Sequence, residues 1–185
     1  MCRSFLDTPV PPAKLDKALA LAACAPSAGN TAGFAFVVLE GARTTAFWQH
    51  AADKSWLERP DHPGLLRAPV IVLPLAGRAA YLARYAEPDK SHVSGPAGWT
   101  VPYWVVDTAF ATMLLLLGLA EEGLGALFFS LRVPPGPLLR ELGVPEGWEP
   151  IGAVAVGWPS EEATARRPKA RKRFGEVVHR GRWQS

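Results

Sequence analysis

The sequence predicts an α+β domain in which helices surround a small sheet, and three observations lead to this prediction. Segments with apolar residues at helical spacing alternate with short runs rich in β-branched and aromatic residues. The length of 185 residues falls within the usual range of a single domain. A hydrophobic content of 49% beside 20% charged residues supplies a sizeable core, which excludes a disordered or fibrous chain.

Proline, glycine and small polar residues delimit the expected elements of the first half of the chain. The predicted helices cover 13–24, 42 to about 57, and 79–86, and the predicted strands cover 34–39 and 68–75. The first helix follows Pro11 and Pro12, because proline fits the first turn of a helix. Pro74 lies inside the second strand, and this predicts an edge position or a bulge because proline cannot donate to a ladder.

The second half of the chain is dominated by a long helix predicted over 103–122, with Gly123 as its cap. Apolar residues lie on every side of this helix, and such a helix is buried all round, often inside a dimer. A strand at 124–131, a short helix at 135–142 and a strand at 151–157 follow.

Charge is concentrated near the C-terminus. Six basic residues and no acidic one lie between 166 and 173, and without them the net charge of +3 becomes −3. A nucleic-acid-binding protein usually spreads its basic residues over a folded face. The segment therefore suits a local anion site or a solvated tail better than a nucleic-acid surface.

Several classes of protein and site are disfavoured. The two cysteines, Cys2 and Cys24, cannot form a disulfide framework or a four-ligand zinc site, and the four histidines are far apart in sequence. The apolar run 109–120 is shorter than a bilayer span, and Arg3 and Asp7 interrupt any apolar signal core. The Rossmann, P-loop, zinc-protease and serine-hydrolase motifs are missing. We expect a soluble cytoplasmic protein without a metal site or a membrane partner.

Several segments, in order along nearly the whole chain, resemble the FMN-dependent nitroreductase superfamily. They are RSFLDTPVP at 3–11, APSAGN at 25–30 with the following strand FAFVVL, EEGLG at 121–125, LGVP at 142–145 before EPIG at 149–152, GWP at 157–159 and EVVH at 176–179. The APSAGN turn and the ordered ensemble carry most of the resemblance.

The resemblance implies a three-layer α/β/α fold with a small, mixed, mostly antiparallel sheet and a long central helix at a dimer interface. It implies a homodimer with two FMN sites, and a C-terminal arm, about 160–185, that crosses to the partner. The implied activity is a ping-pong transfer of hydride from NADH or NADPH through flavin N5 to a nitroaromatic, a quinone or a similar oxidant, in which the flavin carries the chemistry. The alternative is a flavin-binding family member with little reductase activity, and a nucleic-acid-associated protein is the least favoured reading.

By the same resemblance, two N-terminal segments contact the flavin. Arg3 corresponds to a basic residue at the pyrimidine edge of the ring, where a cation stabilises negative charge in the reduced state. The turn corresponds to a segment that packs on the flavin from the partner subunit, and its small residues allow the backbone close to the ring. The residues concerned are Pro26, Ser27, Ala28 and Asn30. Without the resemblance, the two features are a solvated terminal arginine and an ordinary turn after a helix.

Three further pairs follow from the resemblance. Lys169 and Arg171 match a basic pair that binds the FMN phosphate, and a solvated tail is the other reading. Ser130 and Leu131 fall where family members offer backbone N–H groups to flavin N5 and O4; otherwise they are a plain strand end. Tyr103 and Trp104 are candidates to stack on a flat substrate, although core aromatics are the preferred interpretation.

The sequence also departs from the family pattern. Met1 falls about where the serine of an Arg-x-Ser motif would be, so either the start is trimmed or phosphate binding rests on Lys169 and Arg171 alone. Ala32, Gly33 and Phe34 replace the Gln-Pro-Trp that often follows the turn. The loop 61–64 holds no lysine for flavin O2.

Overall fold

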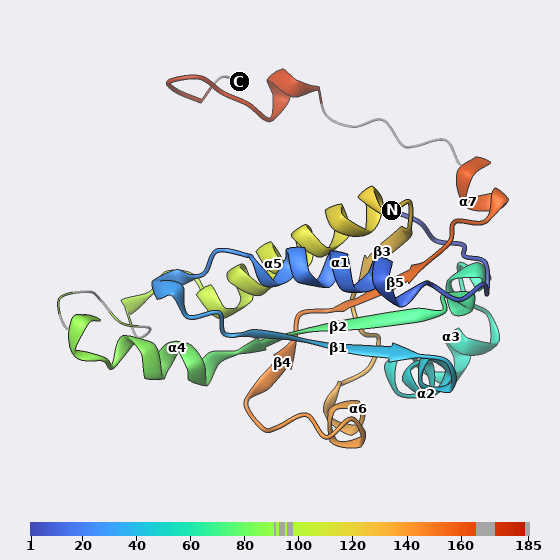
Figure 1. Cartoon of the computed structure of the whole chain (residues 1–185), viewed down its shortest axis with the longest axis horizontal. Helices are drawn as coiled ribbons and strands as arrows, with labels where there is room; N and C mark the ends of the chain where they lie inside the picture. Colours follow the sequence, from blue (N-terminus) through green and yellow to red (C-terminus); the bar gives the residue numbers. More distant parts are fainter. Residues whose placement is uncertain (91, 93–94, 96–97, 166–172, 184–185) are drawn as a thin grey trace.

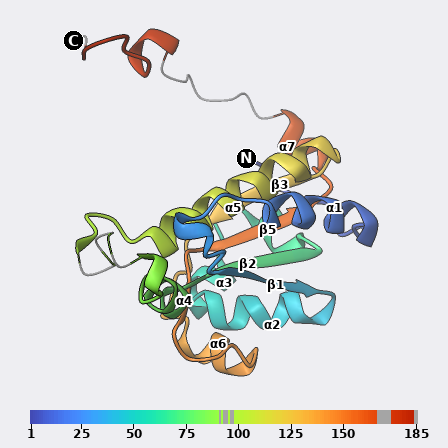
Figure 2. The same ribbon diagram turned by 60° about the vertical axis from the view of Figure 1, so that its left-hand side comes forward.

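The computed structural model describes the chain except residues 91, 93–94, 96–97, 166–172 and 184–185, and it is built in three layers. A sheet forms the middle layer, with α1 (Pro12–Ala23) and α5 (Tyr103–Glu121) on one face and α2 (Ala42–Ala51) and α6 (Gly136–Glu141) on the other (Figures 1 and 2). This arrangement confirms the predicted α+β class and its three layers.

The sheet is antiparallel in every pairing among the described strands. Its order is β1 (Phe34–Glu40), β2 (Val70–Gly77), β5 (Ala153–Gly157) and β3 (Gly125–Phe129), and β4 (Trp148–Pro150) pairs with the end of β2. The resemblance implied a mixed, mostly antiparallel sheet, and the described strands form a sheet that is antiparallel throughout.

The prediction of an edge position for the strand with Pro74 is wrong, because β2 lies in the middle of the sheet. The prediction of a bulge there is confirmed in the neighbouring strand. From Val72 to Leu75 β2 advances three residues, whereas its partner advances four from Val154 back to Pro150. The Pro74 carbonyl accepts the Ile151 N–H at 3.1 Å on this side. The proline thus lies at the break between β4 and β5, where its missing N–H interrupts no ladder.

Each face of the sheet has its own core. On the α2 and α6 face, Phe47, Leu73 and Leu138 are almost fully buried. On the other face, α1 and α5 pack closely, because a Cβ on Gly118 would lie 3.0 Å from the Ala18 Cα. Leu115 of α5 is fully buried between α1 and the sheet.

The predicted helix over 42–57 is two helices. Ala52 is extended after α2, and the Asp53 carboxylate accepts the Trp56 N–H at 2.9 Å to cap α3 (Lys54–Glu58). A local capping bond thus ends the first helix and starts a second one. The 3₁₀ turns Ala28–Asn30, Pro63–Arg67 and Pro88–Lys90, helix α4 (Arg78–Tyr85), helix α7 (Glu161–Ala165) and the turn Phe174–Glu176 complete the described elements.

Helix α5 is the longest element, and its apolar surface is only partly covered. Its buried face, which includes Ala111 and Leu119, packs on α1 and the sheet. On the opposite side Phe110, Met113 and Leu117 are 49%, 54% and 57% exposed. By length and composition alone this helix could span a membrane, and 39% of its most apolar window is buried inside the fold.

Candidate functional site

The turn after α1 has an unusual backbone. Gly29, Asn30 and Ala32 adopt left-handed conformations with φ of 65°, 54° and 47°. Glycine adopts this region freely, whereas a side chain there costs on the order of 1–3 kcal/mol and persists only where the surroundings fix it. Two bonds within the turn contribute: the Ala32 N–H donates to the Ser27 hydroxyl at 2.8 Å, and the Thr31 hydroxyl donates to the Ala28 carbonyl at 2.6 Å.

A buried carboxylate on α5 anchors this turn. Asp107 is 2% exposed, and its Oδ2 accepts the Ala28 N–H at 2.7 Å and the Tyr81 hydroxyl at 2.8 Å. Burial raises the pKa of Tyr81 well above its usual value, and the hydrogen bond and negative charge of Asp107 raise this pKa further. The phenol therefore stays protonated and serves as a donor to the carboxylate.

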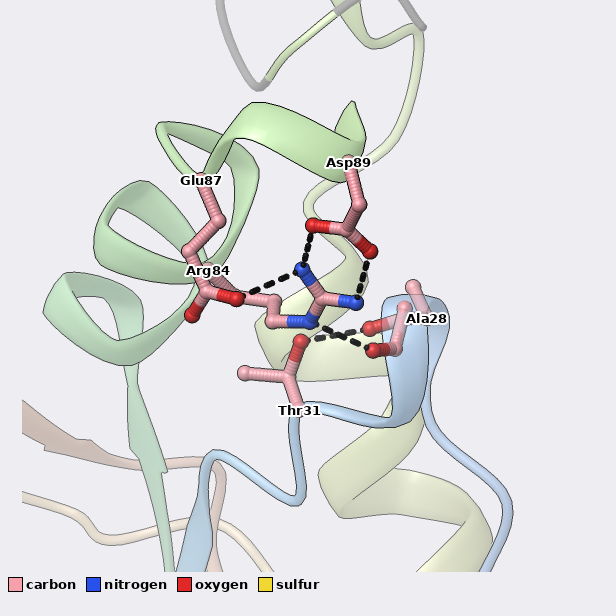
Figure 3. Close-up of polar contacts among 6 residues, drawn as sticks. Ala28, Thr31, Arg84, Glu87 and Asp89 are labelled. Carbon is pink, nitrogen blue, oxygen red and sulfur yellow. Dashed lines mark hydrogen bonds and ion pairs between the residues drawn. The ribbon is translucent and has the colours of Figure 1, made fainter. Parts of the chain in front are cut away.

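An arginine on α4 holds the other side of the turn (Figure 3). The Nε of Arg84 donates to the Gly29 carbonyl at 3.0 Å, and both terminal nitrogens reach the Asp89 carboxylate at 2.8 Å. Glu87 accepts from the same guanidinium at 2.9 Å. The hydrogen bond from Arg84 holds the pKa of Asp89 below its usual value. The backbone of the turn is thus fixed from two helices.

Ring packing leaves room only for glycine at two positions of this region. A Cβ on Gly29 would lie 2.9 Å from the Tyr85 ring, and one on Gly33 would lie 2.4 Å from the Tyr81 ring. The turn therefore packs closely on α4, while Pro26 and Asn30 remain exposed to solvent.

Tyr103 and Trp104 join an aromatic cluster centred on Trp99. The Trp99 ring lies 4.9 Å from the Tyr103 ring and 6.3 Å from the Trp104 ring, and the Tyr85 ring contacts it at 4.8 Å. The Arg78 guanidinium lies 5.3 Å from the Trp104 ring centre. Because Tyr103 and Trp104 are half-buried, they pack in this cluster and also keep a surface toward solvent.

Arg3 lies in an anchored segment rather than a frayed one. On one side the Cys2 N–H donates to the Ala126 carbonyl at 2.8 Å. On the other side Phe5 pairs with Pro159, and the buried Ser4 hydroxyl takes part in hydrogen bonds with Ser160, Glu162 and Arg67. Within the described part of the chain, the exposed Arg3 side chain forms no ion pair.

A shallow groove of about 350 Å³ is lined in part by Met1 and Cys2, the residues that precede Arg3. It lies between the N-terminus, the last turns of α5 and the start of β3. Its lining is Met1, Cys2, Leu116, Ala120, Leu124, Gly125, Ala126, Pro159 and Ala163. A second hollow, of about 440 Å³, lies at the other end of β1 from the turn and contains none of the predicted site residues.

The two remaining predicted pairs lie apart from the turn and from Arg3 or outside the described residues. Ser130 and Leu131 follow β3 at the end away from Arg3; Ser130 is exposed, and Leu131 packs partly on the α2 and α6 core. Lys169 and Arg171 lie outside the described residues.

Two of the predicted flavin contacts, Arg3 and the turn at 26–32, therefore lie toward opposite ends of α5. The turn contacts the N-terminal part of the helix through Asp107, close to Tyr103 and Trp104. At the other end, Arg3 follows Met1 and Cys2, which line the groove together with Leu116 and Ala120. Asp107 precedes Leu116 and Ala120 by 9 and 13 residues, about 14 and 20 Å along the axis at 1.5 Å per residue, so the two groups lie well apart within one subunit.

Three residues of the turn's support were missed by the sequence reasoning: Tyr81, Arg84 and Asp107. Asp107 had a visible signal, because it is the sole charged residue of 103–120 in a helix that is otherwise strongly apolar. Tyr81 and Arg84 lie one helical turn apart on α4, a short helix whose partners no sequence pattern indicates.

Comparisons with known proteins match this architecture. The model of the nitroreductase family matches residues 1–158. A nitroreductase family protein from Clostridium difficile 630 is 23% identical, with a TM-score of 0.71 over 98% of this chain and 93% of that one. The Nitroreductase Family Protein from Streptococcus pneumoniae TIGR4 is 20% identical, with a TM-score of 0.73 over 96% and 94%. A structure described as an oxidoreductase containing FMN is 18% identical, with a TM-score of 0.73 over 99% and 88%. With its fold and nearly its whole length matched, the chain belongs to the nitroreductase family.

Proposed function

We propose that the protein is an FMN-dependent oxidoreductase that takes reducing equivalents from NADH or NADPH and passes them to a nitroaromatic, a quinone or a similar small oxidant. Membership of the nitroreductase family supports the class of reaction. The observation that carries the proposal is the turn at 26–32, a backbone of small residues fixed from α4 and α5 with its outer side open.

This turn fits the flat face of a flavin ring. Its left-handed residues and its small side chains bring main chain, rather than bulky groups, to the surface. Asn30 adds an exposed amide that both donates and accepts hydrogen bonds, which suits the mixed polar edge of the ring.

The proposed enzyme is a homodimer. The apolar stripe of Phe110, Met113 and Leu117 runs along α5 and is exposed in the single chain. A second copy of the stripe is the natural cover for it, since a twofold interface pairs a patch with itself. Obligate interfaces of this kind commonly bury about 2,000 Å² or more.

An antiparallel pairing of the two α5 helices also brings together the two groups of predicted flavin contacts that lie apart in one chain. It sets the end of one helix beside the start of the other, so that Arg3 of one subunit approaches the turn of its partner. Each of two equivalent sites then combines Arg3 and the neighbouring groove with the partner's turn and Tyr103. The separation within one chain is the support for this arrangement.

The residues have distinct proposed roles. When bound, FMN supplies the N5 position that accepts hydride from the nicotinamide and donates it to the oxidant. Arg3 holds a positive charge at the pyrimidine edge, and the backbone near Ser130 and Leu131 offers N–H groups to N5 and O4. Tyr103 and Trp104 line the entrance as flat surfaces for an aromatic substrate.

The proton source is a separate point. Tyr81 is fully buried and its pKa is raised, so water rather than this phenol supplies protons to the product.

The C-terminal segment completes the proposed dimer. Phe174 and Trp183 are 71% and 79% exposed, and the described part of this segment lies away from the body of the subunit (Figure 1). We place it on the partner subunit, with Lys169 and Arg171 at the FMN phosphate. Because both cysteines are free thiols, we place the enzyme in the cytoplasm.

An absorption spectrum of the purified protein tests the proposal. We expect the visible bands of an oxidised flavin, bleached by anaerobic NADH or NADPH and restored by a quinone or a nitroaromatic. A spectrum without flavin that FMN addition does not change would overturn the proposal. A flavin spectrum that neither nicotinamide bleaches would support the alternative, a flavin-binding protein with little reductase activity.

A further inference from the structure

We propose that Asp107 and Arg84 are positioning residues, which hold the turn at 26–32 in the shape that receives the flavin ring. This inference rests on the proposed function, because it assigns a role to residues behind the proposed flavin surface. Neither side chain needs to touch the flavin.

The first argument is the backbone of the turn. Two residues with side chains, Asn30 and Ala32, adopt left-handed conformations. Such conformations persist only where the surrounding structure fixes them. The peptide groups just before them are fixed from opposite sides, since the Ala28 N–H binds Asp107 and the Gly29 carbonyl binds Arg84.

The second argument is the burial of a carboxylate in an apolar helix. Asp107 is 2% exposed, and among the described residues it forms no ion pair. A buried charge is costly unless hydrogen bonds satisfy it. Here the hydrogen bonds come from the Ala28 N–H of the turn and from the Tyr81 hydroxyl. Holding the backbone of the turn is therefore a reason for a buried carboxylate at this position.

The third argument is the way Arg84 is held. Asp89 binds both terminal nitrogens of the guanidinium at 2.8 Å, which leaves Nε directed at the Gly29 carbonyl. Such a bidentate pair fixes the plane of the guanidinium. Figure 3 shows Arg84 between the turn on one side and Asp89 and Glu87 on the other.

The hydrogen bonds of Asp107 suggest two variants that distinguish its geometry from its charge. One oxygen, Oδ2, accepts both hydrogen bonds. Asparagine can place its single amide oxygen at the same point and keep both bonds without the charge, whereas alanine loses both. Asp107→Asn therefore separates the position of the acceptor from its charge.

The experiment measures the dissociation constants of FMN and riboflavin by quenching of free flavin fluorescence. The variants are Asp107→Ala, Asp107→Asn and Arg84→Ala. Glu87→Gln changes a partner on the outer side of the same guanidinium, and Thr112→Val removes a buried hydroxyl of α5 whose hydrogen bond, among the described residues, is to the Thr108 carbonyl. Both serve as matched controls. The melting temperature of each apoprotein is recorded beside the affinities.

We expect Asp107→Ala and Arg84→Ala to weaken FMN and riboflavin by the same factor, about tenfold or more, because each loses a hydrogen bond to a charged group. Asp107→Asn should remain within about threefold of wild type, as should both controls, since the backbone bonds are kept. Hydrogen exchange of the apoprotein should show Ala28 and its neighbours deprotected in Asp107→Ala and protected in Thr112→Val.

Three outcomes would overturn the inference. One is an unchanged affinity in Asp107→Ala or Arg84→Ala. Another is an Asp107→Asn protein that binds flavin as weakly as Asp107→Ala, because charge and not geometry would then matter. The third is a Thr112→Val protein with the same loss of affinity, because general destabilisation would then explain it. A wild-type protein that binds no flavin overturns the proposed function as well, which distinguishes the two failures.

Discussion

At the scale of single residues, the hydrogen bond between Tyr81 and Asp107 decides how the site is supported. The raised pKa of Tyr81 keeps the phenol protonated, so its hydroxyl donates to the Asp107 carboxylate inside the protein. Without Asp107 the buried phenol would lose its acceptor, whereas without Tyr81 the carboxylate would keep the Ala28 N–H as its one remaining donor among these two.

This bond predicts how stability depends on pH. The folded pKa of Tyr81 lies above that of an unfolded tyrosine, about 10, so above this pH the native state holds more protons than the unfolded state. The free energy of unfolding should therefore be at its full value below about pH 10 and fall as the pH rises further. Tyr81→Phe should lose about 1.5–3 kcal/mol at neutral pH, because the bond is to a carboxylate, and should show a flatter decline. Urea unfolding at a series of pH values measures both, and equal slopes in the two proteins would contradict the assignment.

Arg3 gives a prediction about the flavin itself. A cation at the pyrimidine edge favours the reduced, more negative state, so Arg3→Ala should lower the midpoint potential of bound FMN. A shift of about 30 mV corresponds to roughly 1.4 kcal/mol for a two-electron couple, which a redox titration resolves. Oxidised FMN should bind nearly as well as before. A large loss of oxidised FMN at constant potential would instead make Arg3 a contact that only positions the cofactor.

At the scale of elements, the sequence predicts helix α5 but not the separate helix α3 or the short strand β4. The apolar composition of 103–122 predicted a long helix, and α5 spans Tyr103–Glu121. The break between α2 and α3 was missed because the helical pattern continues through Ala52, although Asp53 is a typical N-cap residue. The three residues of β4 are too few to show a strand period, so no pattern could reveal them.

If the exposed apolar stripe of α5 forms the dimer interface, a charged side chain introduced into it should disrupt the dimer. Leu117→Lys places an ammonium in the proposed interface and should convert the dimer to a monomer at micromolar concentration, because an unpaired buried charge costs several kcal/mol. Gln49→Lys on α2, on the other face of the sheet, is the matched control and should leave the mass unchanged. Sedimentation velocity distinguishes the two states. A wild-type protein that sediments as a monomer would exclude this use of the stripe.

At the scale of the whole molecule, the resemblance proposes flavin contacts but does not predict how they are arranged in space. A resemblance points to residues one at a time, and it led to the turn and to Arg3 as candidate contacts. Their positions at opposite ends of α5 depend on how the chain folds back over the sheet. The supporting residues Tyr81, Arg84 and Asp107 act through partners 26 to 79 positions away, and no local pattern records such distances.

The proposed division of the site also predicts how phosphate binding separates from ring binding. Replacing both Lys169 and Arg171 by alanine should weaken FMN by about tenfold or more per residue while riboflavin, which has no phosphate, loses little. This contrasts with the parallel losses expected for Asp107→Ala. Titration of both flavins against the double variant measures the difference, and equal losses would remove these two residues from the phosphate site.

The close approach of Gly33 to the Tyr81 ring has a consequence for how such a chain can evolve. A Cβ at position 33 would lie 2.4 Å from the ring, so no residue larger than glycine is tolerated while the tyrosine is present. A lineage that acquires a side chain at 33 must first shrink residue 81, and it then loses the hydroxyl that Asp107 accepts. The order of the two changes is fixed, and the intermediate lacks a donor on a buried carboxylate. Descendants should therefore keep glycine and tyrosine together or abandon both along with the acid.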